Sequence, residues 1–432
     1  MRKNLIKEGD EHLKYEIREI VEIANQIVHL GVPMIWENIG DPVAKGEQLP
    51  LWMKQIVSDA ALDDRVYAYS ATKGDLQTRQ FVLDHYSDAR ICGVEDIIFF
   101  NGLGDAINKI FSTLRTTARV IGPNPTYPSH ATAEAIHHGG HHLTYPLQLD
   151  HGGRIDLVAL ENSVREHEDI VGILVISPNN PLGVAHPKED LVEVVRIARQ
   201  NNCFLLFDEI YQNLVFDKSK IVRLADIIGD VPGISMKGVS KEIPWPGGRC
   251  GWIEIYNADQ DENFRGYINT IVVSKMLEVC STTLPQIVFP RIVQHPEFPD
   301  FVAARLDKYR RRMDLALKIF DGCAVLKPVV PDGVFYLTIT VDTHAFPRTA
   351  QLPSGTQDVR DYLDVLESKS ELAKDKFFAY ELMGSEGVCV VPLSGFSSPV
   401  TGFRMTLLEE DEALFEETCH RIRRGAEAFF TT

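Results

Sequence analysis

Four side chains that could carry out chemistry together follow three short apolar runs near the middle of the chain. In chain order they are Asn180 after the run 171–176, Asp208 and Tyr211 after the run 204–207, and Lys241 after the run 233–236. Short runs of β-branched and large apolar residues are typical of buried parallel strands. Ligands of open α/β sheets bind beyond the carboxyl ends of the strands, so we expect these side chains to converge in one crevice.

A lysine, an aspartate, an asparagine and a tyrosine match the reactive groups of pyridoxal phosphate. Its aldehyde forms an imine with a lysine, which makes Lys241 the candidate catalytic residue. Its ring nitrogen stays protonated beside a buried carboxylate, for which Asp208 is the candidate. Its phenolic oxygen accepts hydrogen bonds, and Asn180 and Tyr211 are the candidate donors. Each residue alone has an ordinary explanation, such as a helix cap or a packed tyrosine, but their joint occurrence at strand ends favours the cofactor.

The phosphate of such a cofactor needs backbone N–H groups at a helix N-terminus and a positive charge. Gly102, Leu103 and Gly104 form an expected strand-to-helix turn that offers the N–H groups, and Arg249 offers the charge. A plain tight turn and a solvated surface arginine are the alternatives for these residues.

Two more residues complete the candidate site. Tyr127 follows the strand expected at 119–122 and is placed to stack on the cofactor ring. Arg404 stands near the start of the apolar run 403–408. A buried arginine needs a partner, and arginine recognises carboxylates bidentately, so Arg404 is the candidate for the substrate α-carboxylate. An internal salt bridge is the alternative.

Strands and helices alternate up to about residue 256, which predicts βαβ units. We therefore expect an α/β fold with a large domain, whose mostly parallel sheet is sandwiched by helices, and a smaller α+β domain built from both chain ends. A helical, charge-rich stretch at 299–320 is the expected connector. The predicted division is 1–65 and 313–432 for the two parts of the small domain and 66–312 for the large domain. Other expected elements are helices at 11–30, 105–114 and 358–383 and strands at 96–100, 334–341 and 387–391.

The net charge and the composition of the chain argue against several classes of partner. The 432 residues include 44 basic and 61 acidic side chains, and this net charge of −17 argues against nucleic acid and anionic membranes. No apolar stretch is long enough to span a membrane, and the start lacks the apolar core of a signal peptide. Seven scattered cysteines are typical of reduced thiols, so we expect a cytoplasmic protein.

Four histidines lie within residues 137–142. Such a cluster can hold a transition metal. We favour an exposed, histidine-rich turn centred on glycine, and predict no metal site.

The residues above resemble the motifs of the class I/II aminotransferases, which are pyridoxal-phosphate enzymes of fold type I. The resemblance runs from about Asn38 to Leu408. Asn180-Pro-Leu-Gly183 resembles the family's Asn-Pro-x-Gly motif, and Asp208-Glu-Ile-Tyr211 resembles its Asp-x-x-Tyr motif. Ser240-Lys241, followed by Gly248-Arg249-Cys-Gly251, resembles the stretch that holds the imine lysine and a phosphate arginine.

The resemblance implies further roles. Asn101 to Ala106 matches the phosphate turn, Pro125-Thr-Tyr127 the stacking aromatic, and Gly40-Asp-Pro42 a glycine turn on the substrate side. Tyr69 matches a tyrosine that reaches the phosphate in the neighbouring subunit, which implies a homodimer with a shared active site. One departure is Gly238, where the family often has a phosphate-binding serine or threonine. Ser240 or Lys237 is the candidate substitute.

The activity that the resemblance implies is a ping-pong transfer of an amino group between an amino acid and a 2-oxo acid. A β-eliminating lyase of the same fold and a catalytically inactive protein that binds the cofactor are the alternatives, because fold and cofactor do not fix the reaction. Trp36, Trp245 and Tyr67 could line an apolar pocket, which leans towards neutral or aromatic amino acids.

Overall fold

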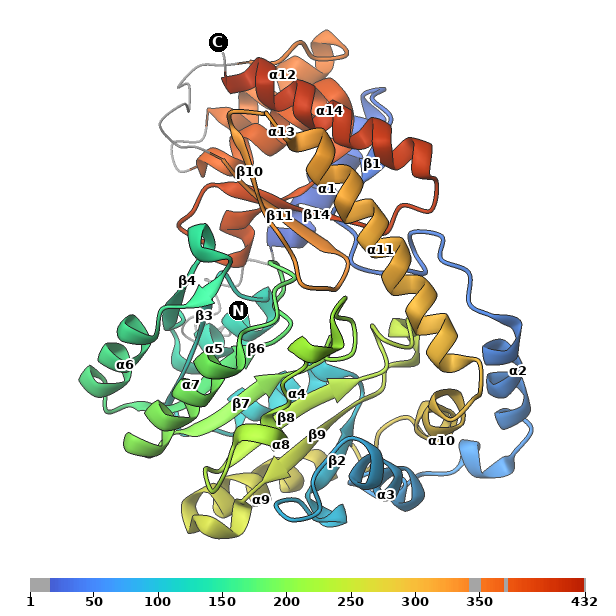
Figure 1. The fold of residues 1–432 in the computed structure, drawn as a ribbon, viewed down its shortest axis with the longest axis vertical. Coiled ribbons are helices and arrows are strands. Elements are labelled where there is room, and N and C mark those ends of the chain that lie inside the picture. The colour runs from blue at the N-terminus through green and yellow to red at the C-terminus, as the bar shows by residue number, and fades with distance from the viewer. Residues whose placement is uncertain (1–15, 342–350, 369–371, 431–432) are drawn as a thin grey trace, which may run out of the picture.

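An eight-stranded sheet forms the lower half of the molecule as drawn in Figure 1. The computed structural model describes residues 16–341, 351–368 and 372–430. The order across the sheet is β2-β9-β8-β7-β6-β3-β4-β5. The bounds are β2 Ile97–Phe100, β3 Arg119–Asn124, β4 Thr144–Gln148, β5 Arg154–Ile155, β6 Ile170–Ile176, β7 Phe204–Asp208, β8 Gly233–Gly238 and β9 Gly251–Tyr256.

The middle of this sheet is parallel, from β4 through β3, β6 and β7 to β8. The register pairs Ile176 with Asp208 and Asp208 with Met236, so these strands end level with one another. The segments that follow β6, β7 and β8 therefore leave the sheet at one edge. β9 is antiparallel to both of its neighbours, β2 and β8, and returns the chain from that edge.

Helices cover both faces of this sheet because alternate strand residues point to opposite sides. In β7, for example, Phe207 packs into one core and Leu206 into the other. The face of Leu206 is covered by α4 (Leu103–Ser112), α5 (Pro128–His138) and α9 (Glu262–Met276). The face of Phe207 is covered by α2 (Leu51–Ala60), α3 (Leu76–His85), α6 (Leu157–Glu166), α7 (Lys188–Gln200), α8 (Leu224–Ile227) and α10 (Thr283–Val293).

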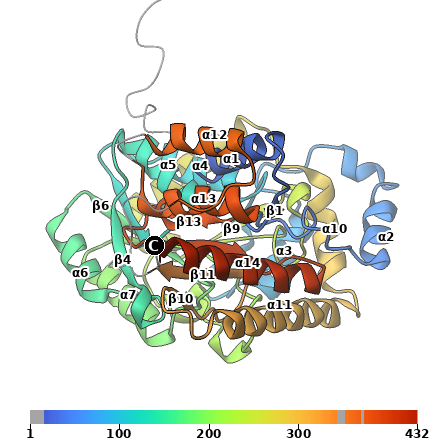
Figure 2. The same ribbon diagram turned by 90° about the horizontal axis from the view of Figure 1, so that it is seen from above.

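A second, antiparallel sheet lies above the first in Figure 1 and has the order β10-β11-β14-β13. Its bounds are β10 Leu326–Val329, β11 Tyr336–Val341, β14 Gly402–Thr406 and β13 Val391–Pro392. Figure 2 shows the helices gathered around it, which are α1 (Glu16–His29), α12 (Gln357–Glu367), α13 (Lys374–Glu386) and α14 (Glu412–Phe430). A short parallel pair, β1 (Ile35–Trp36) with β12 (Val388–Cys389), ties the N-terminal segment to this part.

The helix α11 (Phe298–Phe320) runs between the two sheets (Figure 1). Its first residue, Phe298, packs into the core of the large sheet. Later residues, among them Tyr309 and Ala316, pack into the core of the small sheet. The helix therefore packs into both cores and joins them.

The predicted α/β fold is confirmed, with a large, mostly parallel sheet flanked by helices. The strand expected at 387–391 is wrong in detail, because it divides into β12 and β13, which belong to different sheets. The antiparallel strand β9 was not anticipated. The helix expected at 11–30 is described from Glu16 on, and residues 11–15 lie outside the described part of the chain. The division at residues 65 and 312 stays a prediction.

Candidate active site

Lys241 lies in the turn that follows β8, at the carboxyl edge of the large sheet. Its Nζ donates a hydrogen bond to the carbonyl oxygen of Gly40, at 2.8 Å. The same Nζ lies 5.9 Å from the centre of the Phe335 ring. Gly40 comes from the N-terminal segment and Phe335 directly precedes β11, so the amine stands between the two sheets.

Asp208 ends β7, and its carboxylate is buried, with 3% of the residue exposed. Oδ2 lies 2.9 Å from Nε2 of His130, on α5, and Oδ1 accepts the N–H of Ile210 at 3.2 Å. An ionised carboxylate has about four acceptor sites, so each oxygen can still accept another hydrogen bond. His130 was not predicted. Its position three residues after Tyr127 in a helical stretch was the available signal.

Tyr211 is buried, and its hydroxyl lies 2.9 Å from the hydroxyl of Tyr336 at the start of β11. Burial, followed by the proximity of Tyr336, raises the pKa of Tyr211 well above its usual value of 10. The hydroxyl of Tyr211 therefore keeps its proton at neutral pH and remains a hydrogen-bond donor. Tyr336 was missed by the sequence argument, because an aromatic residue that opens an apolar strand is indistinguishable from a core residue.

Arg404 and Asn180 lie together although they are far apart in the sequence. Nη1 of Arg404 donates to Oδ1 of Asn180 at 3.2 Å, and Nη2 donates to the carbonyl oxygen of Asn38 at 2.7 Å. The guanidinium lies 4.4 Å from the ring centre of Tyr336 and 5.0 Å from that of Phe396. An arginine held against two rings, with hydrogen bonds on both terminal nitrogens, is oriented for a planar anion.

The turn 101–104 is built around Gly102, which has φ of +82° and caps α4. A Cβ atom at Gly102 would lie 2.6 Å from Nη2 of Arg249, so the guanidinium lies directly against the turn. Nη2 also donates to the carbonyl oxygen of Asn101 at 3.3 Å. The N–H groups of Leu103 and Gly104 lie in the first turn of α4, where intrahelical acceptors are absent.

These donors fit pyridoxal phosphate. The first turn of α4 and Arg249 could hold its phosphate, and a side chain at position 102 would fill the space beside the guanidinium. The Asp208 carboxylate has spare acceptor capacity for a ring N–H. Lys241 supplies the primary amine.

Three other predicted residues have the following surroundings. Tyr127 is half-buried and lies edge-on to His130, with ring centres 6.2 Å apart. Ser240 is half-buried next to Lys241. Tyr69 is 81% exposed in the single chain, so it is available to another subunit.

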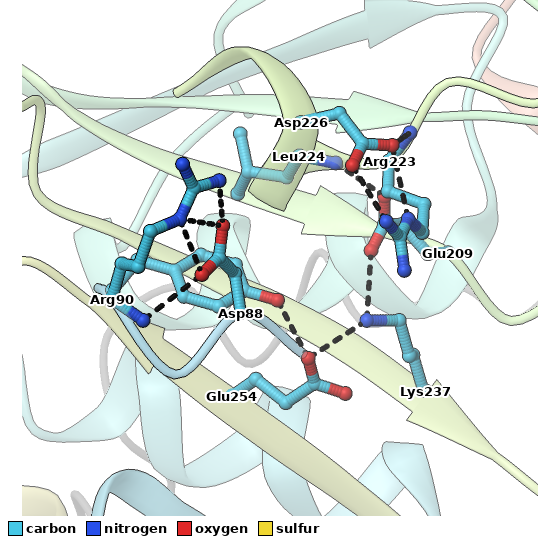
Figure 3. A network of polar contacts seen from close by, with 9 residues as sticks. Asp88, Arg90, Glu209, Arg223, Leu224, Asp226, Lys237 and Glu254 are labelled. Atoms are coloured by element: carbon cyan, nitrogen blue, oxygen red, sulfur yellow. Dashed lines mark hydrogen bonds and ion pairs between the residues drawn. The ribbon is translucent and has the colours of Figure 1, made fainter. Parts of the chain in front are cut away.

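Lys237 does not face the phosphate turn, so it cannot take the phosphate-binding role that the family's serine or threonine has at the position of Gly238. Its side chain points to the opposite face of β8, where Nζ lies 2.9 Å from Glu254 and 3.3 Å from Glu209 (Figure 3). Glu254 also accepts hydrogen bonds from Trp252 at 2.9 Å and Tyr256 at 2.6 Å. This buried network joins β8 and β9 to the residue after Asp208. Ser240 stays the candidate substitute.

The three aromatic residues expected to line a substrate pocket have different surroundings. Trp36 packs against the core of the small sheet and Trp245 against one core of the large sheet. Tyr67 is 76% exposed and donates its hydroxyl to the carbonyl oxygen of Ala61 at 2.8 Å.

Contrary to expectation, the histidine cluster is not exposed throughout, because His137 is buried in the last turn of α5. Its Nε2 lies 2.9 Å from the carbonyl oxygen of Ala118 and 3.1 Å from that of Arg115. No group of three or more metal-ligating side chains occurs within the described ranges. No helix within them is both long and apolar enough to cross a membrane.

Fold and site together define a pyridoxal-phosphate enzyme of fold type I. A sequence model of the family "Aminotransferase class I and II" matches residues 34–422. The chain belongs to this family, and it is a pyridoxal-phosphate-dependent aminotransferase. The resemblance stated from the motifs is thereby confirmed, as are the cofactor and the enzyme class.

Relatives and solved structures agree with this assignment. The chain is 42% identical to an uncharacterized aminotransferase of Methanocaldococcus jannaschii over 437 residues, which covers all of both chains. It is 26% identical to the glutamate-pyruvate aminotransferase AlaA of Escherichia coli, over 78% of this chain and 82% of that protein. Among solved structures, an Escherichia coli aminotransferase has a TM-score of 0.85 at 22% identity, covering 100% of this chain and 99% of that one. An alanine aminotransferase from Pyrococcus furiosus has a TM-score of 0.83 at 22% identity, with 98% and 99% covered.

Proposed function

We propose that Lys241 is the catalytic lysine, and that the site accepts a small neutral amino acid as donor and a 2-oxo acid as acceptor. The observation that carries the assignment of the lysine is its placement between Gly40 and Phe335, at the strand edge that also carries Asp208. Lys241 is well placed to reach both cofactor and substrate.

Each residue has a defined task in this proposal. Bound pyridoxal phosphate supplies an electron sink for the charge that develops at the substrate α-carbon. Asp208, oriented by His130, holds a proton on the ring nitrogen. Tyr211 and Asn180 donate hydrogen bonds to the phenolic oxygen. With the cofactor bound, the freed Nζ of Lys241 would act as the base that removes the α-proton of the substrate and then as the acid that returns it.

The phosphate and the substrate carboxylate are held at opposite ends of the site. Gly102, Leu103, Gly104 and Arg249 bind the phosphate, with Ser240 as an additional donor, and Tyr127 stacks on the ring. Arg404 binds the α-carboxylate next to Gly40. These contacts fix the orientation of the substrate's Cα–H bond relative to the cofactor ring. Proton transfer requires this positioning.

The preference for a small side chain rests on Tyr336. A Cβ atom at Gly40 would lie 2.7 Å from the hydroxyl of Tyr336, and the ring of Tyr336 lies under Arg404. Tyr336 and Phe396 therefore fill the space beside the carboxylate site. The names of two groups of relatives, glutamate-pyruvate aminotransferase and alanine aminotransferase, share alanine or pyruvate, its 2-oxo acid, which agrees with a small neutral substrate on one side of the reaction.

A panel of amino donors tests the substrate assignment. Alanine, glutamate, aspartate, valine and phenylalanine are offered with pyruvate or 2-oxoglutarate, and kcat/KM is measured for each pair. We expect alanine with 2-oxoglutarate to lead among the donors. A preference for aspartate or phenylalanine by about tenfold, equivalent to about 1.4 kcal/mol, would contradict the small-substrate assignment. Ammonia release in place of the new amino acid would favour the lyase.

We further propose a homodimer in which Tyr69 completes the site of the partner. Large apolar side chains are exposed on the two segments that meet where Oγ1 of Thr283 donates to the carbonyl oxygen of Ala68 at 2.9 Å, including Tyr67, Tyr69, Met276 and Leu277. Thr282 joins this region to the turn, because its N–H donates to Oδ1 of Asn101 at 3.0 Å. Exposed apolar groups of this size in one region are typical of a subunit interface. A cytoplasmic location is proposed from the charge and the cysteines alone.

A further inference from the structure

Arg305 contacts the main chain of Lys241. It belongs to α11 and is 3% exposed. Its Nη1 donates to the carbonyl oxygen of Lys241 at 3.1 Å and to that of Glu242 at 2.7 Å. Lys241 and Glu242 lie outside every helix and strand, so regular secondary structure offers their carbonyl groups no donor. Arg305 supplies that donor from the helix that joins the two sheets.

The guanidinium of Arg305 is itself fixed by a buried acid and a buried phenol. Its Nε lies 2.5 Å from Oε1 of Glu47, and its Nη2 donates to the hydroxyl of Tyr309 at 3.0 Å. That hydroxyl in turn donates to Oε2 of Glu47 at 3.0 Å. Glu47 is 6% exposed and Tyr309 is fully buried. A charged pair in such surroundings has little freedom to adopt a second arrangement.

A further carboxylate lies near the same guanidinium. The side chain of Glu242 accepts a hydrogen bond from Nδ2 of Asn213 at 2.9 Å. Burial raises the pKa of Glu242, while Asn213 and the charge of Arg305 act in the opposite direction. Asn213 follows Tyr211 by two residues, so this contact also connects the lysine turn with the segment that carries the cofactor-binding tyrosine.

Glu47 belongs to the segment that begins at Gly40. This segment interacts with Lys241 at two points, once directly and once through Arg305. The carbonyl oxygen of Gly40 accepts the hydrogen bond of Lys241 Nζ. Glu47 reaches the main chain of Lys241 through Arg305. The segment folds back on itself, because the N–H of Glu47 donates to the carbonyl oxygen of Pro42 at 2.9 Å. Both ends of the lysine are thus placed relative to one short stretch of chain.

We propose that Arg305 is a positioning residue for Lys241, and that its ion pair with Glu47 sets the lysine in place relative to the Gly40 segment. The inference rests on the role proposed for Lys241. Arg305 acts through the lysine main chain. Loss of its contacts displaces the Nζ atom from its line of approach to the α-proton, and a misplacement of about 1 Å costs roughly 100-fold in rate.

The test uses cofactor-loaded enzyme with Arg305→Met, Arg305→Lys and Glu47→Gln. For Arg305→Met we expect kcat to fall roughly 100-fold, with a much smaller change in KM for the amino donor. We also expect the pH midpoint of the cofactor absorbance band to move, a readout that does not depend on turnover. Glu47→Gln keeps an acceptor for Tyr309, so it shifts both readouts less, and Arg305→Lys restores part of the loss.

Arg310→Met is the matched control. Arg310 is an exposed arginine on α11 whose Nη2 also donates to a main-chain carbonyl oxygen, that of Phe216 at 2.5 Å, and this variant should keep wild-type kcat and absorbance. A folded Arg305→Met enzyme with wild-type kcat and an unmoved titration would overturn the inference. If that variant does not fold, Arg305→Lys and Glu47→Gln decide by the same two readouts. A wild-type enzyme with no cofactor band would instead refute the proposed function.

Discussion

The proposed chemistry depends on individual residues, and the sequence predicted those that have a distinctive type. Lys241, Asp208 and Arg404 stand out because a charged residue beside an apolar run is costly to bury without a purpose. Their supporting residues do not stand out. His130, Tyr336 and Arg305 occupy ordinary helix or strand positions, and only the fold brings them to Asp208, Tyr211 and Lys241.

Replacing Asp208 by asparagine tests the residue-scale assignment. The amide has nearly the same shape, but it carries no negative charge to hold a proton on the ring nitrogen. We expect kcat to fall about 100-fold or more, while the variant still binds cofactor. Steady-state kinetics at saturating donor and acceptor measure the change. Asp226→Asn, at an aspartate paired with Arg223 on the surface helix α8, is the control, and equal activity of the two variants would disprove the role of Asp208.

Secondary-structure elements place these residues, and here the sequence predicted the parallel strands well. β6 is a continuous apolar run and β7 is one up to Asp208, because both of their faces are buried. β9 was missed because the chain after Lys241 passes through Pro244 and Pro246, which obscure the start of a strand. The charged network on β8 and β9 was also beyond prediction, since a lysine within a strand indicates no partner from sequence alone.

The network around Lys237 makes a prediction at this scale. Lys237→Met leaves Glu209 and Glu254 buried without their shared cation, which should lower the free energy of unfolding by about 3–5 kcal/mol. Urea unfolding at fixed protein concentration measures this change in the free energy of unfolding. The exposed Lys218→Met is the control. A loss below about 1 kcal/mol, typical of exposed pairs, would show that the network does not stabilise the strands.

The same network predicts a pH dependence. Burial by itself lowers the pKa of Lys237, but Glu254 and Glu209 outweigh it, so the pKa is raised in the folded state. The stabilisation is therefore present below the unfolded pKa of about 10.4 and is lost as pH rises through the folded pKa. The difference in unfolding free energy between wild type and Lys237→Met should shrink in that alkaline range, and a difference that grows there would contradict the assignment.

The whole molecule combines two sheets from interleaved parts of the chain. The composition and the alternation of strands and helices along the sequence were enough to predict this fold class. The sequence could not show how the two parts meet, because that depends on contacts across hundreds of residues, such as Arg404 with Asn180. A single chain also leaves Tyr69 exposed. The proposed dimer gives that side chain a function.

Mixed dimers test this proposal at the scale of the molecule. Lys241→Ala and Tyr69→Phe subunits are each expected to be impaired, and they are mixed under conditions that allow subunit exchange. If Tyr69 serves the partner's site, each hybrid dimer contains one intact site, so activity rises above the sum of the two parents. Unchanged activity after verified exchange would place Tyr69 in the site of its own subunit or outside any site.

The most direct test of the central assignment is chemical labelling of the cofactor lysine. The enzyme loaded with pyridoxal phosphate is reduced with borohydride, digested, and mapped by mass spectrometry. We predict that the cofactor is found on Lys241, and that Lys241→Ala loses the label while remaining folded. A label on another lysine, such as Lys237, or no label at all, would contradict the account.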